Sequence, residues 1–253
     1  MLIQFQSIEY LARSERQGHT NLEPNAVHLW GVELEGSPDC LGQCAQWLDE
    51  EERQRAARLI RDEDRQRFVF AHGGLRVILS RYLEVSSEMI EIRRSEGGKP
   101  FLGRELQGQS SIMFNMSHSH GRMLIAVSKG QEVGVDLERI RSDVEVAKLS
   151  ARYFAPSEHA VMMQSDEEDR AAWFFRYWVS KEAVLKAQGV GLQGLSECEV
   201  LLGADGIGTE IRVPFGSRIH NNWTVRRLLC GEGWEAAVAA QGKDWVVQCG
   251  AAL

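Results

Sequence analysis

The stretch GVDLE (residues 134–138) carries the strongest signal for fold and site in this 253-residue chain. Its alternation of apolar and polar residues predicts a strand, and successive side chains of a strand point to opposite faces. Val135 and Leu137 then share one apolar face, while Asp136 and Glu138 share the other. Short extended runs surround this stretch and helical patterns precede and follow them. Mixed runs of this kind favour an α+β fold with mainly antiparallel sheets.

Two carboxylates on one strand face repel each other. A divalent cation between Asp136 and Glu138 would turn this repulsion into attraction, and ligands made only of oxygen suit Mg²⁺. The alternative interpretation is a solvated strand face, where acidic side chains are common. The pattern by itself leaves both interpretations open.

A second motif, WVSKEAVLK (residues 178–186), lies on a predicted helix that ends at Gly189. Glu182 and Lys186 are four positions apart, so they share one face of this helix. An ordinary helix ion pair is the simpler interpretation. Aromatic residues crowd the preceding turns, however, and indicate a largely buried helix. A buried acid and base need partners, and a metal or a phosphate is one such partner.

Two further motifs supply candidate anion ligands. FNMSHSHG (residues 114–121) offers the Ser117 hydroxyl and the His118 imidazole, and GKP offers Lys99 on a turn fixed by Pro100. The sequence has neither H-E-x-x-H, G-x-S-x-G nor a P-loop, which argues against a zinc protease, a serine hydrolase and a P-loop nucleotide hydrolase. Together the four motifs predict Mg²⁺-assisted chemistry on a phosphate ester or anhydride.

The composition narrows the class of partner. The net charge of −7 argues against nucleic-acid binding, which needs a clustered positive surface. The apolar runs are too short to span a bilayer, so we expect no membrane insertion. The first residues lack a basic segment followed by an apolar one, and five cysteines without a C-x-x-C pair suggest free thiols. We therefore expect a cytoplasmic protein.

The order G-K-P, F-N-x-S-H-S, G-V-D-L-E and W-x-x-K-E-A-x-x-K-x-x-G-x-G-L resembles the 4′-phosphopantetheinyl transferase superfamily, in particular its larger, Sfp-type group. The resemblance implies two similar α+β halves related by a pseudo-twofold axis, with coenzyme A between them. Residues 1–112 would form the N-terminal half with nucleotide-side contacts. Residues 113–253 would carry the magnesium and catalytic residues. A monomer is expected.

The resemblance also implies an activity. Members move 4′-phosphopantetheine from coenzyme A to a serine of an apo acyl or peptidyl carrier protein, with Mg²⁺, and release 3′,5′-ADP. Asp136, Glu138 and Glu182 match the magnesium carboxylates, and Glu182 is also the expected general base. Lys186 would meet the phosphoryl oxygens. A non-catalytic coenzyme A-binding regulator and a Mg²⁺-dependent phosphoester hydrolase are the alternatives on the same scaffold.

The remaining site residues also follow from the resemblance. On an early helix, Arg55 is the first candidate for the 3′-phosphate of coenzyme A, and Arg53 is the second. The other expected cofactor contacts are Lys99, Pro100, Ser117 and His118. For the carrier protein we expect a local docking patch made of Arg139, Arg141, Lys148, Leu149 and Phe154.

Overall fold

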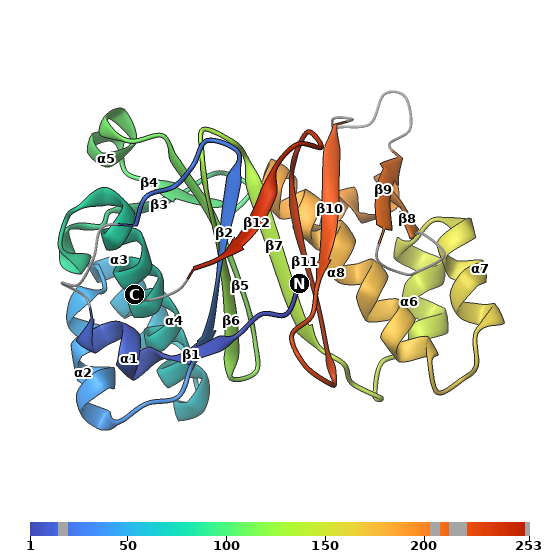
Figure 1. Cartoon of the computed structure of the whole chain (residues 1–253). Coiled ribbons are helices and arrows are strands. Elements are labelled where there is room, and N and C mark those ends of the chain that lie inside the picture. Colours follow the sequence, from blue (N-terminus) through green and yellow to red (C-terminus); the bar gives the residue numbers. More distant parts are fainter. Residues whose placement is uncertain (15–19, 203–207, 213–221, 251–253) are drawn as a thin grey trace.

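The computed structural model describes residues 1–14, 20–202, 208–212 and 222–250. Two five-stranded sheets lie at the centre of the molecule, and helices cover the outer side of each (Figure 1). Most strand pairs are antiparallel, and the exceptions are two parallel pairings of one strand. The expected α+β class with mainly antiparallel sheets is confirmed.

The first sheet follows the order β1-β2-β6-β5, and β12 pairs with β2. Its strands are β1 (Phe5–Ser7), β2 (Ala26–Glu33), β5 (Ile112–Ser119), β6 (Arg122–Lys129) and β12 (Val246–Cys249). The second sheet follows the order β7-β11-β10-β9-β8. Its strands are β7 (Val133–Arg139), β8 (Glu199–Leu202), β9 (Gly208–Arg212), β10 (Trp223–Leu228) and β11 (Trp234–Gln241). A separate hairpin pairs β3 (Ile92–Arg94) with β4 (Pro100–Leu102).

The helices form two groups on opposite sides of the sheets (Figure 1). The N-terminal group is α1 (Ile8–Arg13), α2 (Pro38–Trp47), α3 (Glu50–Ala57), α4 (Asp62–Leu83), η1 (Ser87–Met89) and α5 (Arg104–Gln109). The C-terminal group is α6 (Val146–Tyr153), α7 (Pro156–Gln164), α8 (Arg170–Gln188) and η2 (Leu192–Glu197). As the sequence predicts, α8 ends at Gly189, whose φ of 73° lies in the left-handed region that glycine tolerates.

The strand pairing differs from the boundary expected at residues 112 and 113. Strands β5 and β6 follow that boundary in the sequence, yet both belong to the first sheet. The chain changes sheet between β6 and β7, and it returns to the first sheet in β12. The extended pattern that begins after Ser110 marks a change of local structure and not a change of sheet.

Three apolar clusters hold these layers together. One lies under the N-terminal helices, one lies under the C-terminal helices, and one joins the two sheets. The apolar face of β7, with Val133, Val135 and Leu137, belongs to the cluster between the sheets. The opposite, polar face of β7 is therefore left to face α8. This arrangement places the acidic residues Asp136 and Glu138 of β7 beside α8.

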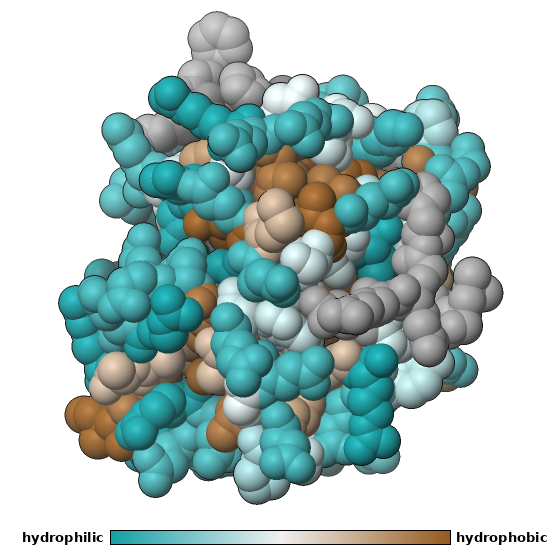
Figure 2. All heavy atoms as spheres, turned by 90° about the vertical axis from the view of Figure 1, so that its left-hand side faces the viewer, coloured by the Kyte–Doolittle hydropathy of each residue, from teal (hydrophilic) through white to brown (hydrophobic). Residues whose placement is uncertain are grey.

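The polarity of the surface, the cysteines and the helix lengths complete the description of the fold. The face that carries the N-terminal helices is mostly hydrophilic, with a recessed hydrophobic area in its upper part (Figure 2). All five cysteines are free thiols, as expected. Among the described residues, no helix combines the length and the apolar character needed to cross a membrane.

Candidate active site

Strand β7 and helix α8 lie in close contact at the centre of the site. Gly134 permits this approach, because a Cβ atom there would collide with the backbone of Ala183 and Ala187. Any other residue at this position would push the helix away from the strand. The contact covers the polar face of β7, so that Asp136 is only 2% exposed. For Asp136, the solvated strand face is therefore excluded.

Asp136 connects three of the predicted motifs. Its Oδ1 atom accepts hydrogen bonds from Lys186 Nζ at 2.5 Å and from Ser117 Oγ at 2.8 Å. Lys186 Nζ also donates to Ser117 Oγ at 2.9 Å. Residues from β5, β7 and α8, far apart in the sequence, thus meet at one carboxylate.

Side chains of β5 form a polar seam between the two sheets. The backbone N–H groups of residues 135, 137 and 139 in β7 each donate to a side chain of β5. The accepting oxygens belong to Asn115, Ser117 and Ser119, at 3.1, 3.3 and 3.3 Å. Ser119 Oγ also donates to Glu138 Oε2 at 2.8 Å. The spacing of two on both strands explains the F-N-x-S-H-S motif, because it fixes the backbone that carries Asp136 and Glu138.

The carboxylates of the site influence one another. Burial raises the pKa of Glu182 to about 7, with Asp136 and Glu138 adding to the rise and Lys186 opposing it. Burial and the charge of Asp136 also raise the pKa of Glu138, while the Ser119 hydrogen bond opposes that shift. Negative charge is therefore concentrated here beyond what the single lysine neutralises.

Two buried carboxylate oxygens of the described residues lack a hydrogen-bond partner, and both are in this site. They are Asp136 Oδ2 and Glu182 Oε1. An unpartnered buried anionic oxygen is costly, and a hard cation such as Mg²⁺ would satisfy both atoms. The donor set thus fits the predicted ion.

The same atoms do not form a metal cage by themselves. Across the described ranges, no group of three or more His, Cys, Asp or Glu side chains is arranged to hold a metal ion. Mg²⁺ commonly takes one or two carboxylates and fills its shell with phosphate oxygens and water. The site formed by Asp136, Glu138 and Glu182 stays a prediction.

A cavity of about 550 Å³ opens beside these residues. Its walls come from α3, α4, the β3–β4 hairpin, β5 and α8. Most of the predicted site residues line it, namely Arg55, Lys99, Pro100, Ser117, His118, Glu182 and Lys186. Asp136 meets this lining through its contacts with Ser117 and Lys186.

The two candidate arginines of α3 have different positions relative to the cavity. Arg55 lines the cavity, with its guanidinium 5.9 Å from the centre of the Phe68 ring. Arg53 instead pairs with Glu50 at 3.4 Å and donates to the carbonyl of Leu48. Residues two apart on a helix point in directions that differ by roughly 200°. The structure brings Arg55 to the cavity and leaves Arg53 outside it.

Lys99 and His118 both line the cavity, and they differ in charge. Lys99 Nζ forms an ion pair with Glu132 and donates to the carbonyl of Ala187. Loss of surrounding water and the positive charges of His72 and Lys186 lower the pKa of His118. A lowered pKa keeps this ring neutral near pH 7, so His118 offers a hydrogen bond rather than a charge.

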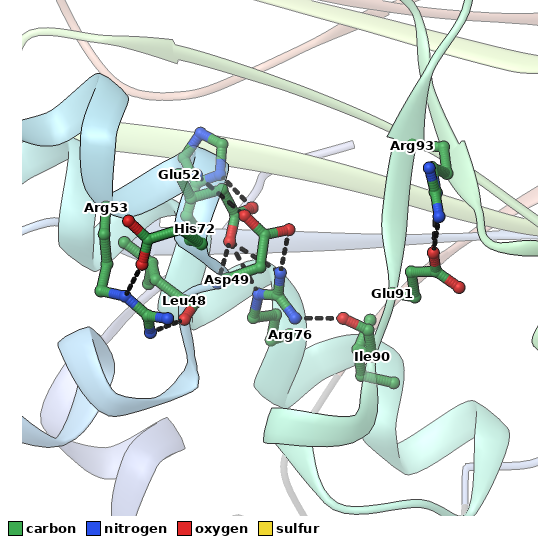
Figure 3. Close-up of polar contacts among 10 residues, drawn as sticks. Leu48, Asp49, Glu52, Arg53, His72, Arg76, Ile90, Glu91 and Arg93 are labelled. Carbon is green, nitrogen blue, oxygen red and sulfur yellow. Dashed lines mark hydrogen bonds and ion pairs between the residues drawn. The ribbon is translucent and has the colours of Figure 1, made fainter.

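A buried network on the N-terminal side of the cavity is centred on Glu52 (Figure 3). His72 Nδ1 lies 2.7 Å from Glu52 Oε1, and Arg76 donates to Glu52 Oε2 at 2.7 Å. Burial raises the pKa of Glu52, but His72 and Arg76 outweigh it and bring the pKa down to about 2. The His72 ring stacks on Phe68 at 4.0 Å, and both rings line the cavity.

Asp49 and Glu52 form a capping box at the start of α3, with hydrogen bonds of 2.8 and 3.1 Å. The further pairing of Glu52 with His72 and Arg76 depends on how α3 packs against α4. Sequence patterns within either helix do not reveal it.

Arg94 is a cavity residue that the sequence analysis missed. It is the last residue of β3, and its Nη1 atom donates to the carbonyl of Gly98 at 3.1 Å. A lone arginine before a glycine turn carries no motif. Its proximity to the G-K-P motif was the available signal.

Lys181, next to Glu182 in the helix motif, serves the core. It is fully buried, lies 2.8 Å from Glu158 Oε2 and donates to the carbonyl of Leu195 at 3.0 Å. Glu158 Oε1 also accepts from the Val200 N–H at 2.7 Å. This pair ties α7, η2 and β8 to α8 and so fixes the helix that carries Glu182.

The expected carrier patch is only partly at the surface. Arg139, Arg141 and Lys148 are exposed. Phe154 was also expected there, and this was wrong. Its side chain is 6% exposed and stacks on Phe174 with ring centres 5.2 Å apart. An aromatic residue at the end of a short helix packs into the apolar layer beneath it.

Known proteins with similar sequences belong to the family that the site residues indicate. The fold and the cleft define an α+β enzyme with anion-binding groups at its centre. Residues 132–240 match the 4′-phosphopantetheinyl transferase superfamily, and residues 35–131 match the N-terminal region of 4′-phosphopantetheinyl transferases. The two regions meet where the chain passes from the first sheet to the second.

Individual relatives carry the same description. The chain is 35% identical to 4′-phosphopantetheinyl transferase HetI of Nostoc sp. over 219 residues, which are 87% of this chain and 89% of HetI. It is 27% identical to 4′-phosphopantetheinyl transferase Sfp of Bacillus subtilis, over 79% of this chain and 84% of Sfp. A putative 4′-phosphopantetheinyl transferase of Synechocystis sp. is 36% identical, over 58% of this chain and 59% of that protein. The chain belongs to the 4′-phosphopantetheinyl transferase superfamily.

Proposed function

We propose that the enzyme transfers 4′-phosphopantetheine from coenzyme A to a serine of an apo acyl or peptidyl carrier protein and releases 3′,5′-ADP, with Mg²⁺ as the metal. The unpartnered oxygens of Asp136 and Glu182, beside a cavity with several cationic side chains, carry this proposal. These two features support a cation bound on one side of the site and phosphate groups bound on the other.

The acidic residues would bind the metal, and Lys186 would bind the phosphate. Asp136 and Glu182 would hold the ion, with Glu138 beside them. Bound Mg²⁺ supplies positive charge to the diphosphate of coenzyme A. Lys186, which donates to both Asp136 and Ser117, offers its remaining N–H to a phosphoryl oxygen as negative charge develops there.

Glu182 is the proposed general base. In the metal-free protein its pKa is about 7, and a bound cation would lower this pKa and keep the carboxylate ionised, as a base that accepts a proton must be. The proton of the carrier serine would pass to a Glu182 carboxylate oxygen, directly or through one water. The burial of Glu182, with 8% of its surface exposed, limits the access of bulk water to this step.

The carrier protein would dock beside the end of β7. Arg139 and Arg141 follow the two acidic residues of that strand and are exposed, and Lys148 lies on α6. A local basic patch on a chain of net charge −7 would select an acidic partner without attracting all polyanions. We further propose a cytoplasmic enzyme that acts as a monomer.

A mass-shift assay tests the function. The protein is incubated with Mg²⁺, coenzyme A and an apo carrier protein, and the carrier is then weighed by mass spectrometry. Transfer adds one phosphopantetheine to the carrier. A phosphoester hydrolase would release 3′,5′-ADP without any carrier, and a binding protein would do neither. Either of these last two results contradicts the proposal.

A further inference from the structure

A buried imidazole lies where the C-terminal strand β12 joins the first sheet. His28 of β2 is 7% exposed and does not line the cavity. Gln248 is its partner in the parallel pairing of β12 with β2 (Figure 1). The side chains also meet, since His28 Nε2 lies 2.9 Å from Gln248 Oε1. The other ring nitrogen, Nδ1, lies 2.9 Å from the Tyr82 hydroxyl of α4. One imidazole thus joins β2 to both β12 and α4.

Trp30 determines where the protons of these hydrogen bonds lie. Its indole N–H can only donate, and it donates to the Tyr82 hydroxyl oxygen at 2.8 Å. The Tyr82 hydroxyl therefore accepts from Trp30 and has its own proton left to donate to His28 Nδ1. With Nδ1 as an acceptor, the neutral ring carries its proton on Nε2, which donates to Gln248. The complete network of His28, Trp30, Tyr82 and Gln248 requires a neutral imidazole.

A proton on His28 Nδ1 would break this network. The Tyr82 oxygen would then face two N–H donors, from Trp30 and from His28, and its own hydrogen would lose its acceptor. A buried donor without an acceptor is costly. When β12 separates from β2, Gln248 no longer contacts the ring, and water can hydrate a protonated imidazole. Protonation therefore favours the separated strand.

The charged groups around the network do not favour a protonated His28. On α4, the Arg81 guanidinium lies 5.2 Å from the centre of the Trp30 ring. On β6, Lys129 shares the wall of a small cavity with Tyr82. From α1, the titratable group is Tyr10, which interacts with Arg81. Both cations disfavour a further positive charge nearby, and among the described residues no carboxylate raises the pKa of His28.

The direction of the pKa shift agrees with this geometry. Burial lowers the pKa of His28 below its ordinary value of 6.5, and the hydrogen bond with Gln248 opposes the shift. A lowered pKa means that the neutral ring and the attached strand favour each other. This stabilisation is fully present above pH 6.5 and is lost as the pH falls through the lowered pKa of the paired state.

We propose that His28 is a pH-sensitive latch for the C-terminal strand: the neutral ring holds β12 on β2, and protonation releases it. Release leaves the edge of β2 at residues 26–29 unpaired, because β12 pairs with this part of the strand. An unpaired strand edge can pair with another chain. The latch is independent of the proposed function, since none of its four side chains lines the cavity.

Hydrogen exchange of the full-length, metal-free protein tests the release of β12. Exchange is followed by mass spectrometry from pH 5 to pH 7.5 in peptides from β12 and from β11, and is corrected for the intrinsic rate at each pH. Strand β11 belongs to the second sheet and reports changes in the stability of the whole molecule. One proton changes an opening equilibrium by at most about tenfold per pH unit. We expect opening of β12, relative to β11, to increase about tenfold between pH 7 and pH 5.

Two histidine variants identify the responsible group. His28→Gln cannot be protonated, so its β12 opening should be the same at pH 5 and pH 7, whatever its level. His159→Gln is the matched control and should respond like the wild type. His159 also contacts a neutral hydroxyl, Ser150 Oγ at 2.7 Å, but it lies on α7 on the other side of the molecule (Figure 1). A wild type without a pH response of β12, or a His28→Gln variant that keeps the response, would overturn the proposal.

Nitrogen NMR of the imidazole tests the latch without relying on strand opening. We expect the Nε2–H tautomer at pH 7.5 and a pKa below 6.5 for His28. Trp30→Phe leaves the Tyr82 hydroxyl free to turn away from a protonated ring, and it should raise the pKa of His28 by about one pH unit.

Trp245→Phe is the control for this variant and should leave the pKa of His28 unchanged. It removes another buried indole, directly before β12, whose N–H donates to the Gly242 carbonyl at 3.2 Å. If Trp30→Phe does not fold, the tautomer and the pKa of the wild type decide. An Nδ1–H tautomer, a wild-type pKa at or above 6.5, or the same pKa in folded Trp30→Phe would overturn the proposal.

Discussion

Two buried glutamates on opposite sides of the cavity have opposite electrostatic surroundings. Glu52 is 6% exposed and Glu182 is 8% exposed. Glu52 is paired with His72 and Arg76, and its pKa falls to about 2. Glu182 has an oxygen without a partner and two acidic neighbours, and its pKa rises to about 7. The two carboxylates are buried to a similar degree, but the charge of Glu52 is compensated by its neighbours and the charge of Glu182 is not.

Glu182 lines the cavity, whereas Glu52 lies behind the lining residue His72, and the two carboxylates have different roles. The carboxylate of Glu52 is satisfied by the chain itself, so its charge supports the fold. The carboxylate of Glu182 is not satisfied, so its charge costs stability unless something else binds. Perturbed carboxylates of this second kind are characteristic of functional sites. Variants of the two glutamates should therefore fail in different ways.

The largest expected effect is on activity. Glu182→Gln removes the proposed base and one metal ligand at nearly constant shape. We expect a loss of roughly 10²- to 10⁴-fold in kcat in the mass-shift assay, with a far-UV circular dichroism spectrum like that of the wild type. Retention of most activity would remove both roles from Glu182.

The matching change in the other glutamate should affect stability. Glu52→Gln leaves Arg76 buried with only the partly exposed Asp49 as an acidic partner, at 3.2 Å. Breaking a buried ion pair in this way costs about 3–5 kcal/mol of unfolding free energy. Urea unfolding measures the loss. An unchanged unfolding midpoint would show that the network does not hold α3 against α4.

The pH dependence of stability should differ in sign between the two sites. Glu52 contributes stability that is present above its ordinary pKa of 4.5 and is lost as pH falls through about 2. Glu182, with a raised pKa, costs stability as pH rises from 4.5 through about 7. Each contribution is up to about 3 kcal/mol.

Urea unfolding of the metal-free protein across pH checks both windows. Glu182→Gln should flatten the profile above pH 4.5, and Glu52→Gln should flatten it below that value. A profile flattened below pH 4.5 by Glu182→Gln and above pH 4.5 by Glu52→Gln would contradict the assigned roles of the two glutamates. Added Mg²⁺ should restore stability at pH 8 in the wild type and do so less in Glu182→Gln, since ligand binding stabilises the folded state.

The smallest expected effect concerns the polar seam. Ser119→Ala removes the hydroxyl that holds Glu138 and the Arg139 N–H, and we expect about a tenfold loss of kcat, in the range of losses when residues that orient metal ligands are changed. Ser119→Thr should recover most of it. Ser128→Ala is the control, because this serine is also buried and bonds to the Gln131 carbonyl, outside the cavity.

The sequence revealed the catalytic side of the site better than the nucleotide side. Asp136, Glu182 and Lys186 follow from strand alternation and helix spacing, which are local rules. Arg53 and Arg55 are equally basic, and only the packing of α3 decides which one reaches the cavity. Arg94 belongs to a hairpin whose place depends on contacts distant in the chain. The sheet boundary after β6 depends equally on non-local strand pairing.

The central claim is that the two unpartnered oxygens bind a metal together with the diphosphate of coenzyme A. A crystal structure of the protein grown with coenzyme A and Mn²⁺ in place of Mg²⁺ tests it most directly, because the anomalous signal locates the ion. We predict a peak about 2.1 Å from Asp136 Oδ2 and from Glu182 Oε1, with diphosphate oxygens completing the shell. A bound cofactor with no ion on these two oxygens would contradict the account.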